Sequence, residues 1–277
     1  MNNYPWTLFF VLLAGGVLGT AAVMPYALSL NKNSIPDEVK AKIKLPKPVL
    51  FAISILQTSL LVAIASFLGL LAARAVGVQL PLLEALVAGQ PVGNAVLQLL
   101  PLALLAAVIV GAVMFVLEGF AFLPRLPKEL HAAEVDTSFW KRLLACFYGG
   151  IVEETLMRLF LVSGIAWLLG RVWHAPGGAP ADGAFWLAIF LAALLFGAGH
   201  LPATRAIVKL TPLVVARALL LNGIPGLVFG YLFWRHGLAA AMMAHFILDL
   251  FVHLGFTPII KATLRRSAPQ TAGVIPG

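Results

Sequence analysis

The chain has 277 residues, of which 61% are hydrophobic and 11% are charged. A soluble globular domain normally has about 25% charged residues, so this composition excludes an ordinary soluble enzyme or binding module. The formal net charge of +8 comes from Lys and Arg residues in short loops between apolar runs. Because these residues form no basic helix with interleaved aromatics, a nucleic-acid partner is not expected.

Seven apolar runs are long enough to cross, or nearly cross, a hydrocarbon core that requires about 20 helical residues. Their apolar residues are continuous rather than alternating, which is typical of membrane-spanning helices. The sequence therefore predicts an all-α, polytopic membrane helix bundle with about seven transmembrane helices. The runs cover residues 6–30, 48–76, 97–123, 142–169, 184–201, 213–234 and 238–257.

The first run is expected to stay in the protein as a membrane helix, because no Lys or Arg precedes Lys32 and no small-residue cleavage site follows the run. Between the second and third runs, residues 78–96 form either a short helix on the outer membrane surface or an ordinary loop. In the sixth run, Gly223-Ile224-Pro225-Gly226 predicts a kink or a break. The single cysteine, Cys146, allows no disulfide and is expected to pack in the core.

Lys and Arg are frequent after the first, third, fifth and seventh runs and sparse after the others. By the positive-inside rule, this alternation places the N-terminus outside and the C-terminus in the cytoplasm. All six Trp residues lie near predicted span ends, where an interfacial aromatic belt would place them. The bias towards Ala, Leu, Gly and Pro suggests a GC-rich bacterium, and hence the inner (plasma) membrane. No linker divides the chain, so residues 1–277 are predicted to form one membrane domain.

The fourth run contains two carboxylates and a guanidinium: Glu153, Glu154 and Arg158. An ionised residue at the centre of a membrane helix costs about 2.5–3.5 kcal/mol, so these groups must be paired or must face water. Residues four apart share a helix face, and Glu154 and Arg158 are therefore expected to pair, while Glu153 points elsewhere. A purely structural role for the triplet, as an internal salt bridge between helices, is the competing interpretation.

Three more polar residues lie in the later runs: His200 at the end of the fifth, and His245 and Asp249 on one face of the seventh. At 1.5 Å per residue, Glu153 lies about 17 Å from the cytoplasmic end of its run, and Asp249 about 12 Å. All these side chains fall in the predicted cytoplasmic half, so a shared wet cavity open to the cytoplasm is expected. In such a cavity, Glu153 can act as general base towards a water molecule, and His200 can hold that water.

A carbonyl oxygen that gains negative charge would be stabilised by His245 and Asp249. Asp249 can donate a hydrogen bond to that oxygen only in its protonated form. This set of roles predicts a hydrolytic site, and the lipid bilayer is an expected partner.

The ordered motifs Glu-Glu-x-x-x-Arg, Phe-x-x-x-His and His-x-x-x-Asp, in three apolar segments, resemble the CAAX prenyl protease and bacteriocin-processing (CPBP, or ABI) family of intramembrane peptidases. The best-known members are the Ras-converting endopeptidases, and the similarity covers residues 142–257. The resemblance implies hydrolysis of a membrane-associated or lipidated peptide bond, with a membrane-bound peptide or protein as the expected partner. The resemblance implies that Glu153 activates water with His200, that Glu154 and Arg158 support Glu153, and that His245 lies on the oxyanion side.

Two positions depart from the family pattern. Asp249 stands where Asn is common; Asn is a permanent hydrogen-bond donor, whereas Asp donates only in its protonated form. Leu159 stands where Gly often follows the motif Arg.

Three alternatives remain open at this stage. A zinc-dependent form of the same protease is the nearest, because two His and a Glu can hold zinc and leave a water position; the preferred interpretation requires no cofactor. Buried Glu, His and Asp would also suit a transporter or proton relay. A non-enzymatic immunity or scaffolding protein is the third. His-Glu-x-x-His and Gly-x-Ser-x-Gly are absent from the sequence.

Overall fold

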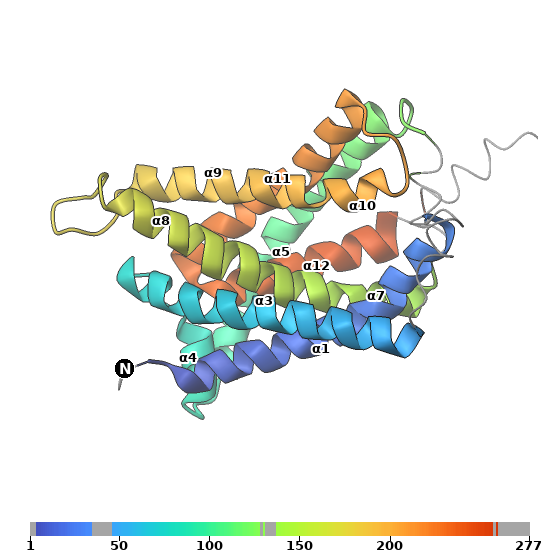
Figure 1. Cartoon of the computed structure of the whole chain (residues 1–277). Helices are drawn as coiled ribbons and strands as arrows, with labels where there is room; N and C mark the ends of the chain where they lie inside the picture. The colour runs from blue at the N-terminus through green and yellow to red at the C-terminus, as the bar shows by residue number, and fades with distance from the viewer. Residues whose placement is uncertain (1–3, 35–45, 128–129, 131–136, 257–258, 260–277) are drawn as a thin grey trace, which may run out of the picture.

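The computed structural model describes residues 4–34, 46–127, 130, 137–256 and 259. Long helices lie side by side in one bundle, and the described residues contain no β-strand (Figure 1). The α-helices are α1 (Trp6–Ser34), α3 (Lys47–Ala75), α4 (Pro81–Val87), α5 (Gly93–Val116), α7 (Phe139–Phe147), α8 (Ser163–Gly170), α9 (Asp182–Gly199), α10 (Leu201–Arg205), α11 (Pro212–His236) and α12 (Leu238–Leu250). Four π-helical segments extend them: η1 (Leu117–Phe122), η2 (Tyr148–Glu153), η3 (Thr155–Val162) and η4 (Phe251–Phe256).

Within the described part of the chain, six helices are long and apolar enough to cross a membrane: Trp6–Ser29, Pro48–Ala75, Gly93–Phe122, Asp182–Arg205, Pro212–His236 and Leu238–Phe256. The predicted all-α polytopic fold is thus confirmed. The expected span at 142–169 corresponds to the continuous helical run from α7 to α8, whose charged residues make it more polar than the other six. A count of seven therefore stays a prediction.

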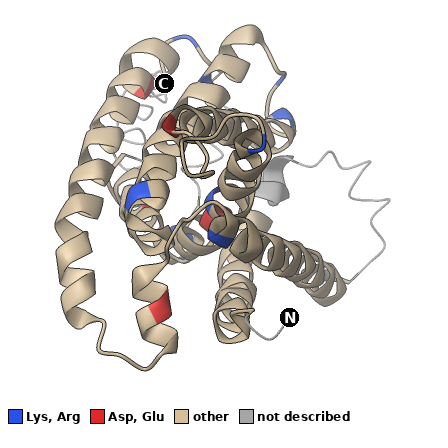
Figure 2. Cartoon of the chain, turned by 90° about the vertical axis from the view of Figure 1, so that its left-hand side faces the viewer, with Lys and Arg blue, Asp and Glu red and all other residues tan. Residues whose placement is uncertain are grey.

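The predicted orientation also stays a prediction. The prediction depends on the Lys and Arg content of the loops, and two of these segments, residues 35–45 and 260–277, lie outside the described residues. Figure 2 shows that Lys, Arg, Asp and Glu are isolated positions on otherwise uncharged helices. Many large apolar side chains are exposed on the outside of the bundle, among them Leu56, Leu60 and Phe120. Such a surface is compatible with lipid as its surroundings.

Two local predictions can be compared with the structure. Residues 81–87 form the short helix α4, so the helical interpretation of this segment is correct. Of the kink or break predicted in the sixth run, the break is wrong, because α11 continues through Pro225 to His236. Close packing supports α11 here, since a Cβ on Gly226 would lie 2.8 Å from the Cβ of Ala193 on α9. Small residues permit this approach of two membrane helices.

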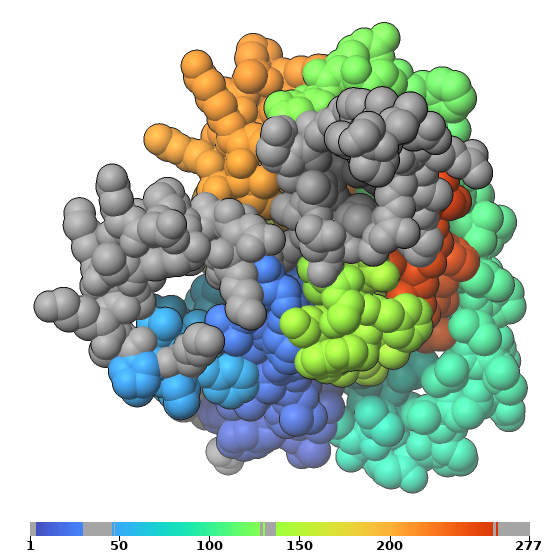
Figure 3. Space-filling view, turned by 90° about the vertical axis from the view of Figure 1, so that its right-hand side faces the viewer, coloured from blue at the N-terminus to red at the C-terminus, as the bar shows by residue number. Residues whose placement is uncertain are grey.

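The helices that carry the polar motifs occupy the middle of the bundle. Helix α12 packs against α5, α11 and η2, while η3 packs against α3 and α9. At one end of the bundle, α7 lies between α1 and η4 (Figure 3). Cys146 on α7 is fully buried, as expected. The polar residues of η2, η3, α9 and α12 thus lie within one packed bundle.

The contact of α3 with η3 depends on a glycine and yields a stability prediction. A Cβ on Gly69 would lie 2.8 Å from the carbonyl oxygen of Leu159, whereas a Cβ on Gly164 would meet nothing within 4 Å. We expect Gly69→Ala to lower the free energy of unfolding by about 1–3 kcal/mol, as overpacking does. Gly164→Ala, the matched control, should be neutral or stabilising by up to about 1 kcal/mol. Denaturant titration in detergent measures both, and equal effects would contradict the packing argument.

Candidate active site

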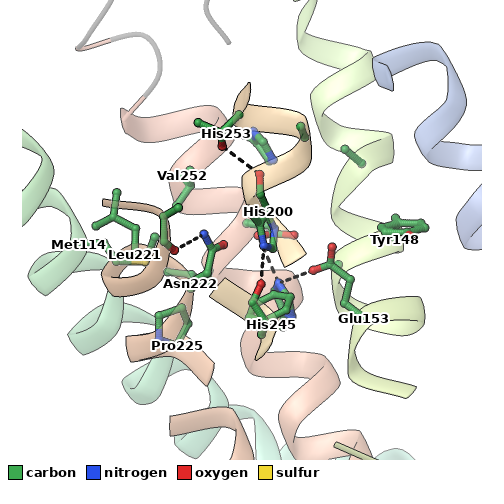
Figure 4. Close-up of a pocket in the computed structure, with 18 of the residues that line it drawn as sticks. Met114, Tyr148, Glu153, His200, Leu221, Asn222, Pro225, His245, Val252 and His253 are labelled. Atoms are coloured by element: carbon green, nitrogen blue, oxygen red, sulfur yellow. Dashed lines mark hydrogen bonds and ion pairs between the residues drawn. The ribbon is translucent and has the colours of Figure 1, made fainter. Parts of the chain in front are cut away.

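Four of the six predicted site residues line one cavity of about 370 Å³. Glu153 ends η2, His200 caps the C-terminus of α9, and His245 and Asp249 lie on α12. Figure 4 shows Glu153 pointing towards His245, with His200 beside them. Residues separated by up to 96 positions in sequence therefore meet around one space.

The two neighbouring glutamates face different surroundings. The Glu153 side chain is 22% exposed and lines the cavity, whereas the Glu154 side chain is fully buried. Glu154 lies between the π-helical segments η2 and η3, and such segments are frequent at functional sites. Glu153 is therefore the carboxylate that can meet water, as the helix geometry predicted.

Glu154 links Arg158 to His245. Its Oε1 lies 2.9 Å from a terminal guanidinium nitrogen of Arg158 and 2.7 Å from Nδ1 of His245. A carboxylate paired with a guanidinium is an acceptor, so Nδ1 of His245 donates this hydrogen bond. The contact fixes the imidazole ring, and the other ring nitrogen, Nε2, is the one left for the cavity. Glu154 thus supports His245 directly, a contact that the sequence did not predict.

Arg158 is almost completely buried, and aromatic rings surround its charge. The guanidinium carbon lies 5.2 Å from the ring centroid of Phe196 on α9 and 5.5 Å from that of Phe229 on α11. Cation–π attraction is strongest where water is excluded. These two rings help to hold the buried cation in place beside Glu154.

His200 has a defined tautomer. Its Nδ1 lies 2.8 Å from the carbonyl oxygen of Phe196, and a carbonyl can only accept, so Nδ1 carries the hydrogen. In the neutral ring, Nε2 then has a lone pair. His200 can therefore accept a hydrogen bond from water in the cavity, as the role predicted from the sequence requires.

The open nitrogen of His245 lies between two carboxylates. Nε2 is 3.7 Å from Oε2 of Glu153 and 3.7 Å from Oδ1 of Asp249. Gly149 on η2 makes this arrangement possible, since a Cβ there would overlap Oδ2 of Asp249 and lie 3.0 Å from His245 Nε2. The sequence analysis did not identify Gly149 as a site residue, although its position one turn before Glu153 was a usable signal.

Two His residues of the cavity have defined ring orientations. Within the described residues, no group of three or more His, Cys, Asp and Glu side chains is arranged to hold a metal ion. His200 and His245 have each committed Nδ1, to the Phe196 carbonyl and to Glu154. Nε2 of each ring is left for the cavity, where it can meet water or act as a metal ligand.

A second ion pair lines the same cavity. Nε of Arg217 on α11 lies 2.9 and 3.1 Å from the two carboxylate oxygens of Glu118 on η1. The sequence analysis missed this pair, because it gave neither Arg217 nor Glu118 a role. A charge inside an apolar run was the signal available for both residues.

Comparison with known families gives one match. Residues 135–251 match the family model described as type II CAAX prenyl endopeptidase Rce1-like. Residues 135–251 form an Rce1-like domain of the CPBP intramembrane peptidases. The predicted resemblance is confirmed, and the Rce1-like domain includes all the predicted site residues. No curated protein and no solved structure matches the chain.

The buried pair in the Rce1-like domain yields a second prediction. Glu154→Leu leaves Arg158 buried without its carboxylate and should lower the free energy of unfolding by about 3–5 kcal/mol. Glu154→Leu with Arg158→Met removes both charges and should recover most of that loss. Peptide hydrolysis should stay about 10- to 100-fold below wild type in both variants, because His245 has lost the acceptor that orients it.

Denaturant titration and peptide hydrolysis, both in detergent, measure these effects. The control is the ion pair between Arg235 and Asp182, whose side chains are 44% and 73% exposed. Asp182→Asn should change the free energy of unfolding by less than about 1 kcal/mol. Full activity in the double variant would contradict the orienting role of Glu154.

Proposed function

We propose that the protein is an intramembrane endopeptidase that hydrolyses a peptide bond of a membrane-associated or lipidated substrate, with water activated by Glu153. One observation carries the proposal: Glu153, His200, His245 and Asp249 line a single cavity within the Rce1-like domain. A general base, a water acceptor and two groups for a developing oxyanion are the parts that peptide hydrolysis requires.

The reaction begins with a water molecule between Glu153 and His200. Glu153 takes one proton from the water while Nε2 of His200 accepts a hydrogen bond from it. The water oxygen attacks the carbonyl carbon, and the carbonyl oxygen becomes an oxyanion. When the tetrahedral intermediate collapses, the carbon–nitrogen bond breaks and Glu153 returns the proton to the leaving amine.

The oxyanion lies on the side of His245 and Asp249. Since Nδ1 of His245 donates to Glu154, Nε2 can donate to the oxyanion when the ring carries both hydrogens. Asp249 can donate in its protonated form. The contact with Glu154 stabilises the ring orientation before substrate binds, which is the preorganisation that makes such donors effective.

The substrate class follows from the walls of the cavity and the membrane setting. Apolar side chains such as Met114, Leu248 and Val252 line the space around the polar residues. An apolar or lipid-bearing peptide suits these walls. With the N-terminus outside, the cavity opens to the cytoplasm, and the bacterial inner membrane is the proposed location.

The decisive variant is Glu153→Gln, which keeps the size of the side chain and removes the base. We expect it to lower kcat at least about 100-fold on a peptide library that includes lipidated C-terminal sequences. Wild-type hydrolysis should persist with a chelator. Loss under chelation with recovery on adding zinc would instead support a metalloprotease. Absence of hydrolysis by folded wild type on every peptide would favour the scaffold or transporter alternatives.

Asp249 provides a separate test through pH. If Asp249 donates a hydrogen bond as a neutral acid, the rate should fall as rising pH ionises it. Asp249→Asn donates at every pH, so this variant should retain activity within about 10-fold of wild type and keep only the alkaline decline that deprotonation of the His245 ring causes. The pH profile of kcat measures both. An unchanged alkaline decline in Asp249→Asn would show that another group causes it.

A further inference from the structure

One face of α11 forms a wall of the cavity opposite Glu153. Ala218, Leu221, Asn222 and Pro225 line the cavity and recur at the spacing of one helix face. Figure 4 shows Leu221, Asn222 and Pro225 on one side, Glu153 on the other, and His200 and His245 between them. The proposed mechanism gives this wall no role.

Proline changes the backbone of that wall. In a regular α-helix the carbonyl of residue 221 accepts from the backbone N–H of residue 225. Pro225 has no N–H, so Leu221 cannot receive this bond. Both residues line the cavity, so the gap in the helical hydrogen bonds lies along the cavity wall.

Asn222 adds a polar side chain next to this carbonyl. Its Nδ2 donates to the Ala218 carbonyl oxygen at 2.8 Å, which holds the amide against the helix. An amide has two N–H donors and one carbonyl oxygen, so a second donor and an acceptor remain for other groups. The wall thus presents a backbone acceptor beside a side-chain donor and acceptor.

We propose that the Leu221 carbonyl and the Asn222 amide bind the backbone of the substrate peptide. An extended peptide presents N–H donors and C=O acceptors along its length. Hydrogen bonds to these backbone groups bind the peptide whatever its side chains are. The Leu221 carbonyl accepts from a substrate N–H, and the Asn222 amide pairs with a neighbouring substrate amide. This role rests on the proposed peptidase function and adds the element that places the scissile bond opposite Glu153.

The test measures binding, so it does not depend on turnover. The probe is a dansyl-labelled heptapeptide with an S-farnesyl cysteine four residues from its C-terminus, together with analogues in which one backbone amide at a time is replaced by an ester. An ester keeps the shape and removes one N–H donor. On Glu153→Gln protein in detergent, we expect one analogue to bind about 5- to 10-fold more weakly than the parent peptide.

A second substitution identifies the acceptor. Pro225→Ala, added to Glu153→Gln, returns an N–H to the Leu221 carbonyl. The ester penalty, which is the ratio of the Kd of that ester analogue to the Kd of the parent peptide, should then shrink to less than about 2-fold. Pro101→Ala is the matched control, because Pro101 also lies inside a helix but is exposed and lines no part of this cavity. It should leave the ester penalty unchanged. The penalty is a ratio within one protein, so a smaller folded fraction in a variant cancels.

A third variant tests the side chain. Asn222→Leu should weaken binding of all the peptides about 3- to 10-fold. An ester penalty that persists in Pro225→Ala, equal binding of every analogue, or no binding of the peptide would each overturn the proposal. Turnover of the parent peptide by wild type is recorded separately. Turnover without an ester effect contradicts this backbone site alone, whereas an ester effect without turnover contradicts the proposed hydrolysis alone.

Discussion

Burial of charge inside apolar helices is the constraint on which the rest of the site depends. Glu154 and Arg158 are both inaccessible to water, and either one alone would be expensive in that place. Their separation by four residues lets them neutralise each other on one helix face. The rings of Phe196 and Phe229 complete the surroundings of the cation, and the pair therefore requires α9 and α11 as well as its own helix.

This pairing has a consequence for the neighbouring residues. Because Glu154 is committed to Arg158, it can serve as a fixed acceptor for Nδ1 of His245 on another helix. Glu153 then remains as the one carboxylate of the adjacent pair that lines the cavity. The pairing that stabilises the buried Arg158 thus also separates the proposed roles of Glu153, as the base, and Glu154, as the acceptor that orients His245.

The cavity lies where regular helical structure is interrupted. Glu153 ends a π-helical segment, His200 caps α9, and Pro225 removes a hydrogen bond from α11. Irregular backbone at membrane depth is tolerated where it is buried in protein or faces a water-filled space. A polar cavity in this position is therefore compatible with the membrane setting.

Much of the fold followed from the sequence, because the length and composition of apolar runs are local properties. The runs located six spanning helices, and the four-residue spacing of Glu154 and Arg158 predicted their pairing. The apolar runs that contain ionisable residues also marked the region that the Rce1-like family model matches. Two local interpretations were less successful: a break at Pro225, allowed beside a kink, ignored the packing of α11 on α9, and Glu118 and Arg217 were given no role.

The sequence by itself determined that the chain is an all-α membrane protein and which apolar segments carry its ionisable groups, since a bilayer imposes a strict relation between hydropathy and span. Only the tertiary structure decided the partners across helices: Glu154 with His245, Arg158 with two aromatic rings, and Gly149 beside Asp249. The physical reason is that helix periodicity fixes which residues share a face, whereas the rotation and depth of each helix relative to its neighbours result from side-chain packing over the whole bundle.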